Sequence, residues 1–305
     1  VLDVATERLG RAWGTVSHLN SVADTPEMRA AFNDSLPKVT AFHTRLGADE
    51  RLFAKYKAVA ASASSAQLPA PRQKALANAL RDFVLSGAEL QGAAKARFAA
   101  IQERTAELSQ KFSEHVLDAT DGFTFHASTH EMDGVPADVQ QATRAAAQAE
   151  GKEGHKLTLH QPVYQPVMQY ATHRELRATL YKAYVTRASE LGPAPQDNTP
   201  LMRELIELRQ EAAQLLGHAS YADVSLVPKM ARTPAEVNAF LQDLAQRAKP
   251  FAERDMQALR EFAAGELGLP QIEAWDIAFA SEKLKEARYA FSDLEIGRAS
   301  CRERV

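Results

Sequence analysis

Histidine pairs offer the most direct route to metal chemistry in this sequence, which contains nine histidines and one cysteine. His126 and His130 are four residues apart, the spacing of two zinc ligands on neighbouring turns of a helix. Residues 123–127, however, are rich in β-formers and alternate in polarity, which is typical of a strand. Four residues of a strand extend about 13 Å, whereas two ligating nitrogens must both lie about 2 Å from one ion. The pair is therefore predicted not to chelate a metal.

The other histidines are also predicted to be structural. His155 and His160 flank a second predicted strand and are expected at the surface or at the edge of the core. The rest lie singly on predicted helices or helix caps, where a structural role is the simpler interpretation; they are His18, His43, His115, His173 and His218.

The motif His-Glu-x-x-His, which supplies two zinc ligands and a general base from one helix, is absent from the 305 residues. His130 and Glu131 begin it, but Gly134 stands where the second histidine should be. No glycine-rich phosphate loop, Gly-x-Ser-x-Gly elbow or dinucleotide fingerprint is present either. The sequence thus predicts no catalytic and no metal-binding residues, and it leaves substrate-binding residues unknown.

Acidic residues repeat along two predicted helices, but their spacing favours ion pairs over catalysis. Neighbouring basic residues lie three or four positions away, as in Arg203 to Glu207 and Glu282 to Lys285. We expect solvated ion pairs for all members of this set: Glu204, Glu207, Glu211, Glu282 and Glu286.

Composition limits the class of partner. The net charge is −3, with 45% hydrophobic and 25% charged residues, as in an ordinary globular protein. No clustered basic surface is available for nucleic acid, and no apolar run of about 20 residues is available for a membrane. The single cysteine, Cys301, lies close to the C-terminus. A chain otherwise free of cysteine fits a reducing compartment, so a cytoplasmic location is expected.

Two dense helical patterns occupy residues 164–230. In the first, Thr172 and Glu175 are predicted to form a capping box ahead of a helix. In the second, Thr199 is the predicted N-cap, Pro200 takes the first helical position, and Gly217 ends the helix in a left-handed conformation.

Helical signals dominate the remaining sequence. Helices are predicted over residues 26–47, with Pro37 bending or interrupting the helix, and over 71–86, 91–118 and 136–150. A capped helix is expected from Thr233 to about residue 268, kinked at Pro250. Residues 123–127 and 155–160 are predicted to be two short strands. The predicted fold is therefore all-α with a small two-stranded β ribbon.

Several short motifs go beyond what helix physics requires and occur in the order found in one family. The chain resembles the thimet oligopeptidase family of zinc metallopeptidases from about Val1 to Asp293. The motifs are Trp13 with Val16-Ser17-His18-Leu19-Asn20-Ser21-Val22, Asn78-Ala79-Leu80-Arg81-Asp82-Phe83, Val116-Leu117-Asp118-Ala119-Thr120, Thr186-Arg187-Ala188-Ser189, Leu215-Leu216-Gly217, Tyr221-Ala222-Asp223, Lys229-Met230-Ala231 and Trp275-Asp276-Ile277-Ala278.

This resemblance implies a mainly helical, clamshell-like enzyme, monomeric at full length, in which two halves face each other across a deep channel that admits short peptides. It also implies a zinc ion that polarises the scissile carbonyl, with a motif glutamate as the base. The family carries those residues in its C-terminal half, so this chain is expected to be an inactive N-terminal part whose helices expose apolar surface toward the missing half. The chain departs from the family at Phe279 and Ala280, where many members carry tyrosines.

Four regions follow from these patterns: an N-terminal helical region (1–118), the β ribbon with its helix (119–161), a helical channel wall (162–293), and a tail (294–305) that is similar to a translated sequencing adapter. Two alternatives stay open. The chain could derive from a dipeptidyl carboxypeptidase of the same family, or it could be a non-catalytic helical module that binds a peptide or partner helix.

Overall fold

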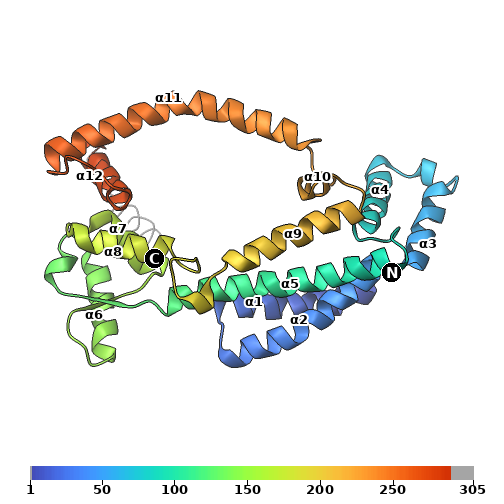
Figure 1. Ribbon diagram of the computed structural model, residues 1–305, viewed down its shortest axis with the longest axis horizontal. Helices are drawn as coiled ribbons and strands as arrows, with labels where there is room; N and C mark the ends of the chain where they lie inside the picture. The colour runs from blue at the N-terminus through green and yellow to red at the C-terminus, as the bar shows by residue number, and fades with distance from the viewer. Residues whose placement is uncertain (1, 290–305) are drawn as a thin grey trace, which may run out of the picture. The chain divides into compact units, whose positions relative to one another are not determined.

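The computed structural model describes residues 2–289, and Figure 1 shows that helices make up nearly all of its regular structure. A single two-stranded sheet accompanies them in this part of the chain, so the predicted fold class is confirmed. The chain divides into two compact units, each built from two separate segments. Unit 1 comprises the chain up to Phe112 together with Pro200–Asn238, and unit 2 comprises Ser113–Thr199 together with the chain from Ala239.

Unit 1 is formed by helices and one 3₁₀ turn. Its elements are α1 (Leu2–Val22), α2 (Pro26–Gly47), α3 (Glu50–Ala61), η1 (Ser65–Gln67), α4 (Ala70–Leu85), the first two thirds of α5 (Gly92–Asp121), α9 (Thr199–Leu215) and α10 (Tyr221–Leu226). Helix α2 begins as predicted, because the Thr25 hydroxyl accepts a hydrogen bond from the Met28 amide. It continues unbroken through Pro37, so the predicted interruption does not occur.

The main core of unit 1 lies between α5 and α9. Phe98, Ile101 and Leu108 of α5 pack against an apolar stripe of α9 that consists of Leu201, Leu205, Leu208 and Ala212. Two bidentate ion pairs flank this seam: Arg104 with Glu204 and Arg97 with Glu211, each at 2.6 Å. These glutamates therefore pair across two helices, and the prediction of pairing within their own helix was wrong for them.

Unit 2 contains the β ribbon. Strands β1 (Phe125–Ala127) and β2 (His155–Leu157) pair antiparallel, with His126 opposite Lys156. The helices are α6 (Ala137–Ala149), α7 (Gln161–Tyr170), α8 (Arg174–Val185), most of α11 (Pro234–Glu266) and α12 (Ile277–Tyr289), with 3₁₀ turns η2 (His130–Met132), η3 (Ala194–Gln196) and η4 (Ala274–Asp276). Leu157, Val167, Leu176 and Leu180 are almost fully buried in its largest apolar cluster. Both strands and the helix between them were predicted.

Helix α8 starts differently from the prediction. His173 is its N-cap, and the ring nitrogen Nδ1 accepts a hydrogen bond from the Leu176 amide at 3.2 Å. Thr172 instead donates through its amide and its hydroxyl to the Asp133 carbonyl, at 2.9 and 3.1 Å. The capping box of Thr172 and Glu175 is therefore wrong, because the threonine is held by a turn 39 residues earlier in the chain.

Other helix ends follow the sequence. Gly217 has φ +79°, and the His218 amide reaches back to the Ala213 carbonyl, which is the left-handed ending predicted for α9. The Thr233 hydroxyl accepts from the Glu236 amide at the start of α11. Figure 1 shows α11 as one continuous, curved helix, so the chain passes Pro250 without a break. Among the described residues, no helix combines the length and apolarity that crossing a bilayer requires.

Candidate functional site

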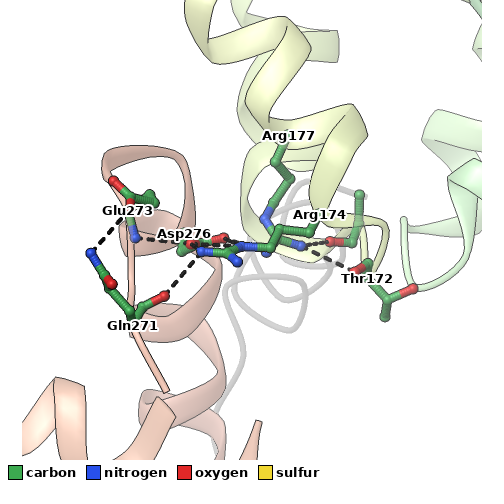
Figure 2. A network of polar contacts seen from close by, with 7 residues as sticks. Thr172, Arg174, Arg177, Gln271, Glu273 and Asp276 are labelled. Atoms are coloured by element: carbon green, nitrogen blue, oxygen red, sulfur yellow. Dashed lines mark hydrogen bonds and ion pairs between the residues drawn. The ribbon is translucent and has the colours of Figure 1, made fainter. Parts of the chain in front are cut away.

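The most concentrated polar cluster of unit 2 joins α8 to η4. Arg174 and Arg177 lie three positions apart on α8, so both side chains reach the same neighbour, Asp276. Arg174 contacts one carboxylate oxygen of Asp276 through Nη2 at 2.7 Å, and Arg177 contacts the other through Nη2 at 2.7 Å. Figure 2 shows the two guanidinium groups converging on this carboxylate, with Gln271 and Glu273 on the opposite side.

Burial of this cluster carries a large desolvation cost for its charged groups. Asp276 is 0% exposed and Arg177 is 1% exposed, so both charges are removed from water. The Arg177 group Nη1 also donates to the carbonyls of Ala171 and Thr172, at 2.6 and 3.2 Å, and the guanidinium lies 4.2 Å from the Phe279 ring centre. Its Nε is buried with no hydrogen-bond partner in the described part of the chain.

The ionisation of these groups reflects that environment. Burial by itself would raise the pKa of Asp276, but hydrogen bonds from Arg174, the Glu273 amide and Arg177 hold that pKa below its ordinary value. Burial lowers the pKa of Arg177, whereas the hydrogen bond to Asp276 raises the pKa of Arg174. The cluster therefore remains a carboxylate with two guanidinium partners at neutral pH.

Asp276 also forms part of the N-terminal cap of η4. Its carboxylate accepts from the Glu273 amide at 2.9 Å, and the Glu273 carboxylate accepts from the Asp276 amide, which is a complete capping box. Both oxygens of Asp276 are thus used within the protein. Because Asp276 is also fully buried, its carboxylate is not accessible to a substrate, and the cluster acts as a buried joint between two parts of unit 2.

Local sequence signals for this joint exist. Trp275 and Asp276 lie in one of the family motifs, although the motif by itself assigns them no role. The spacing Glu273-x-x-Asp276 is that of a capping box, and Arg174 and Arg177 share one helix face. Phe279 is buried beneath Arg177, so the departure from the family tyrosines lies in the interior of the unit.

Glu282 differs from its prediction in one respect. Its ion pair with Lys285 is present at 2.7 Å, as expected. The carboxylate is nearly buried, however, with only 3% of the side chain exposed, and it also accepts from the Tyr170 hydroxyl at 2.9 Å. The interpretation as a solvated pair is therefore wrong, because α12 turns this residue toward α7.

The histidines do not converge on a common point. The Nε2 atom of His126 lies 3.5 Å from Glu150, whereas Nδ1 of His130 lies 2.9 Å from Asp133. His115 contacts Asn198 at 2.8 Å, and His160 contacts Asp121 at 3.1 Å. Within residues 2–289, no group of three His, Cys, Asp or Glu side chains could hold a metal ion. Cys301 lies outside the described residues.

His155 is more buried than the sequence suggested. It is 0% exposed and contacts the Thr143 hydroxyl at 3.0 Å, while Nε2 is buried without a partner in the described structure. The surface or core-edge expectation is therefore wrong for this residue. The reason is that α6 covers the face of β2 from which the side chain projects.

We predict a stability change with pH that originates at His155. Burial, and then the charge of Arg144, lower its pKa below the ordinary value of about 6.5. The unfolded chain therefore binds more protons just below that pH, and the free energy of unfolding of unit 2 falls as the pH drops through and below about 6.5. The free energy of unfolding, measured with denaturant at pH 7.5 and 5.5, should fall less between these two pH values in His155→Gln than in the parent protein. The exposed control His130→Gln should leave the loss unchanged; an equal loss in all three proteins would contradict the prediction.

Each unit contains at least one cavity large enough for a small ligand, and the cavities of about 740 and 500 Å³ gather no catalytic groups. The first lies in unit 1, and its Glu50 and Lys95 are already paired at 2.6 Å. The second lies in unit 2, with Arg187 in its wall. Arg187 donates to the Tyr184 carbonyl and the Thr120 hydroxyl, at 2.9 and 2.8 Å, so this motif residue fixes the end of α8 against α5.

Comparisons with known proteins identify two matching family models. The model "Neurolysin/Thimet oligopeptidase, N-terminal domain" matches residues 1–95, and the model "Peptidase family M3" matches residues 167–304. The second match extends beyond Asp293, where the resemblance was expected to end; the foreign origin of residues 294–305 stays a prediction, and these residues lie outside the described structure.

Individual relatives match over almost the whole chain. Oligopeptidase A of Salmonella typhimurium is 42% identical over 97% of this chain and 44% of its own length. Oligopeptidase A of Escherichia coli is 43% identical over 94% of this chain and 43% of its own length. Dipeptidyl carboxypeptidase of S. typhimurium is 28% identical over 70% of this chain and 32% of its own length. The chain therefore spans less than half the length of these relatives.

Proposed function

This chain belongs to peptidase family M3, and from that membership we propose that it forms the N-terminal, non-catalytic part of a zinc metallo-oligopeptidase that hydrolyses short peptides. The observation that carries the proposal is the colinear match to oligopeptidase A over 97% of the chain, together with the absence of His-Glu-x-x-His from the sequence. Unit 1, unit 2 or both would then contribute a wall of the peptide channel.

The residues present do not fit a zinc site. The sequence lacks the helical motif that would supply two histidines and a base, and His126 and His130 contact different carboxylates. No group of three potential ligands occurs among the described residues. Metal ligands and base would have to come from polypeptide outside the matched region. The role left to this chain is to support and shape the site.

Two finer points are also proposals. Identity of 42% over 97% of the chain to an oligopeptidase A, against 28% over 70% to a dipeptidyl carboxypeptidase, favours internal cleavage of short peptides over removal of C-terminal dipeptides. We place the complete, monomeric enzyme in the cytoplasm, which agrees with a sequence that has no cysteine before Cys301.

The proposal predicts that the 305-residue chain is catalytically silent. The purified chain should bind no stoichiometric zinc in a metal analysis after dialysis and should leave a quenched fluorescent peptide intact. Oligopeptidase A of S. typhimurium, prepared in the same way, is the positive control. Cleavage that a chelator stops, with one zinc bound per chain, would overturn the assignment. His126→Ala and His130→Ala would then show whether the two histidines with the spacing of helical zinc ligands hold the metal.

A further inference from the structure

One helix of unit 2 carries an apolar face that none of residues 2–289 covers. In α11, Phe240, Leu241, Leu244 and Phe251 are 62%, 54%, 46% and 61% exposed. Every residue from 239 to 255 is exposed, whereas Leu259 and Ala263, further along the same helix, are buried in an apolar cluster with Ala280. The exposed stretch therefore has no tertiary support within the described part of the chain.

The exposed side chains are arranged as on a helix built to be buried. At 100° per residue, Phe240, Leu244 and Phe251 fall within an arc of about 40°, and Leu241 and Ala248 extend it to about 100°. Lys249 and Glu253 pair on the opposite side, Asp243 and Arg247 pair along one edge of the arc, and Asp255 lies within it. A stripe of this width is typical of a helix that packs on another element.

The size of the stripe helps to identify its occupant. Four half-exposed side chains present on the order of a few hundred Å² of apolar surface, enough to mark an interaction site. A stable dimer buries roughly 800 Å² per partner, so a second copy would gain too little from this stripe alone. A segment tethered to the same chain loses far less freedom on docking and can use a smaller surface.

We propose that this face of α11 is the surface on which the catalytic part of the enzyme packs, that is, the polypeptide that the relatives carry outside the region matched here. The relatives have more than half of their length in that part, since the match covers 44% of the S. typhimurium protein. The inference rests on the proposed function and adds to it a defined contact surface: Phe240, Leu241, Leu244 and Phe251.

Cysteine labelling can test this contact. With Cys301→Ser as background, Leu244→Cys places a thiol on the apolar face, and Gln246→Cys places one on the opposite, exposed face of the same helix. In the 305-residue chain, both thiols should react with a maleimide at similar rates. In a chimera that replaces the matched region of the S. typhimurium relative by this chain, Leu244→Cys should react at least about tenfold more slowly, and Gln246→Cys should be unchanged. Other cysteines of the chimera are replaced by serine.

Each outcome decides the inference. Equal rates for both thiols in the folded chimera would overturn it, as would slow labelling of Leu244→Cys in the chain alone; in that case, light scattering distinguishes a second copy from another occupant. If the chimera does not fold, cysteines at the aligned positions of the relative provide the same comparison. Peptide cleavage is measured separately. An active chimera with a reactive Leu244→Cys would contradict only the contact surface, whereas cleavage by the chain alone would contradict the proposed function.

Discussion

Replacing Asp276 with alanine will lower the free energy of unfolding of unit 2 by about 3–5 kcal/mol, the loss expected when one partner of a buried ion pair is removed. The substitution leaves Arg177, which is 1% exposed, without its carboxylate. It also removes the acceptor of the Glu273 amide and the main partner of Arg174. The substitution thus removes both the buried ion pairs and the capping box of η4, so the loss of stability exceeds that for a single ion pair.

Trp275 provides a local signal for this measurement. The sequence contains two tryptophans, and Trp13→Phe leaves only Trp275, next to the joint, to report unfolding by fluorescence in denaturant. Asp243→Ala is the control, because it breaks an exposed ion pair with Arg247 and should cost no more than about 0.5 kcal/mol. An exposed ion pair contributes less than about 1 kcal/mol. If Asp276→Ala also costs less than this amount, the buried joint does not stabilise unit 2 as its burial indicates.

The same joint should respond to acid. Because the pKa of Asp276 in the folded protein lies below its ordinary value of about 3.9, its contribution to stability is complete above that pH and is lost as the pH falls through the folded pKa. Asp276→Ala should therefore lose less stability than the parent protein between pH 5 and pH 2.

Gly134→Ala will destabilise unit 2 by about 3 kcal/mol, because it combines backbone strain with a steric overlap. Gly134 has φ +87°, a region that other residues enter at a cost of about 1–2 kcal/mol. An added methyl group would also overlap the Tyr170 carbonyl oxygen and approach the methyl group of Thr172 to 3.1 Å. Neither neighbour can move freely, since Thr172 is bonded to the Asp133 carbonyl and the Tyr170 side chain is buried.

Gly151→Ala separates the two causes. Gly151 has φ +69° but open space where the methyl group would lie, so the substitution should cost only the backbone strain, about 1 kcal/mol. Thermal or denaturant unfolding of both variants gives the difference directly. Equal losses at the two positions would show that the turn at Gly134 relaxes around the methyl group.

Local sequence signals predicted much of the fold. Thr25, Thr233 and Gly217 end or begin helices where expected, because the groups that satisfy a helix terminus lie within a few residues of it. The apolar stripe of α9 was likewise visible as a period of three and four residues.

The predictions were wrong where a segment distant in the sequence binds or covers the residue concerned. Thr172 donates a hydrogen bond to the Asp133 carbonyl, so His173 is the N-cap of α8 instead. Helix α6 buries His155. Asp276 lies 99 residues from Arg177, so their pairing has no local signature. For the candidate site, the sequence predicted that catalytic residues are absent. The described structure adds that both carboxylate oxygens of Asp276 are engaged by other groups of the protein.

The pairing of α5 with α9 has a consequence for synthesis on the ribosome. Arg104 and Glu204 are 100 residues apart, and the apolar residues beside them have the same separation. At about 5–20 residues per second, a nascent chain exposes Phe98, Ile101 and Leu108 to solvent for roughly 5–20 s before their partners emerge. During that interval the half-built unit 1 lacks the helix that covers this apolar face, and slow codons between the two helices would lengthen its exposure.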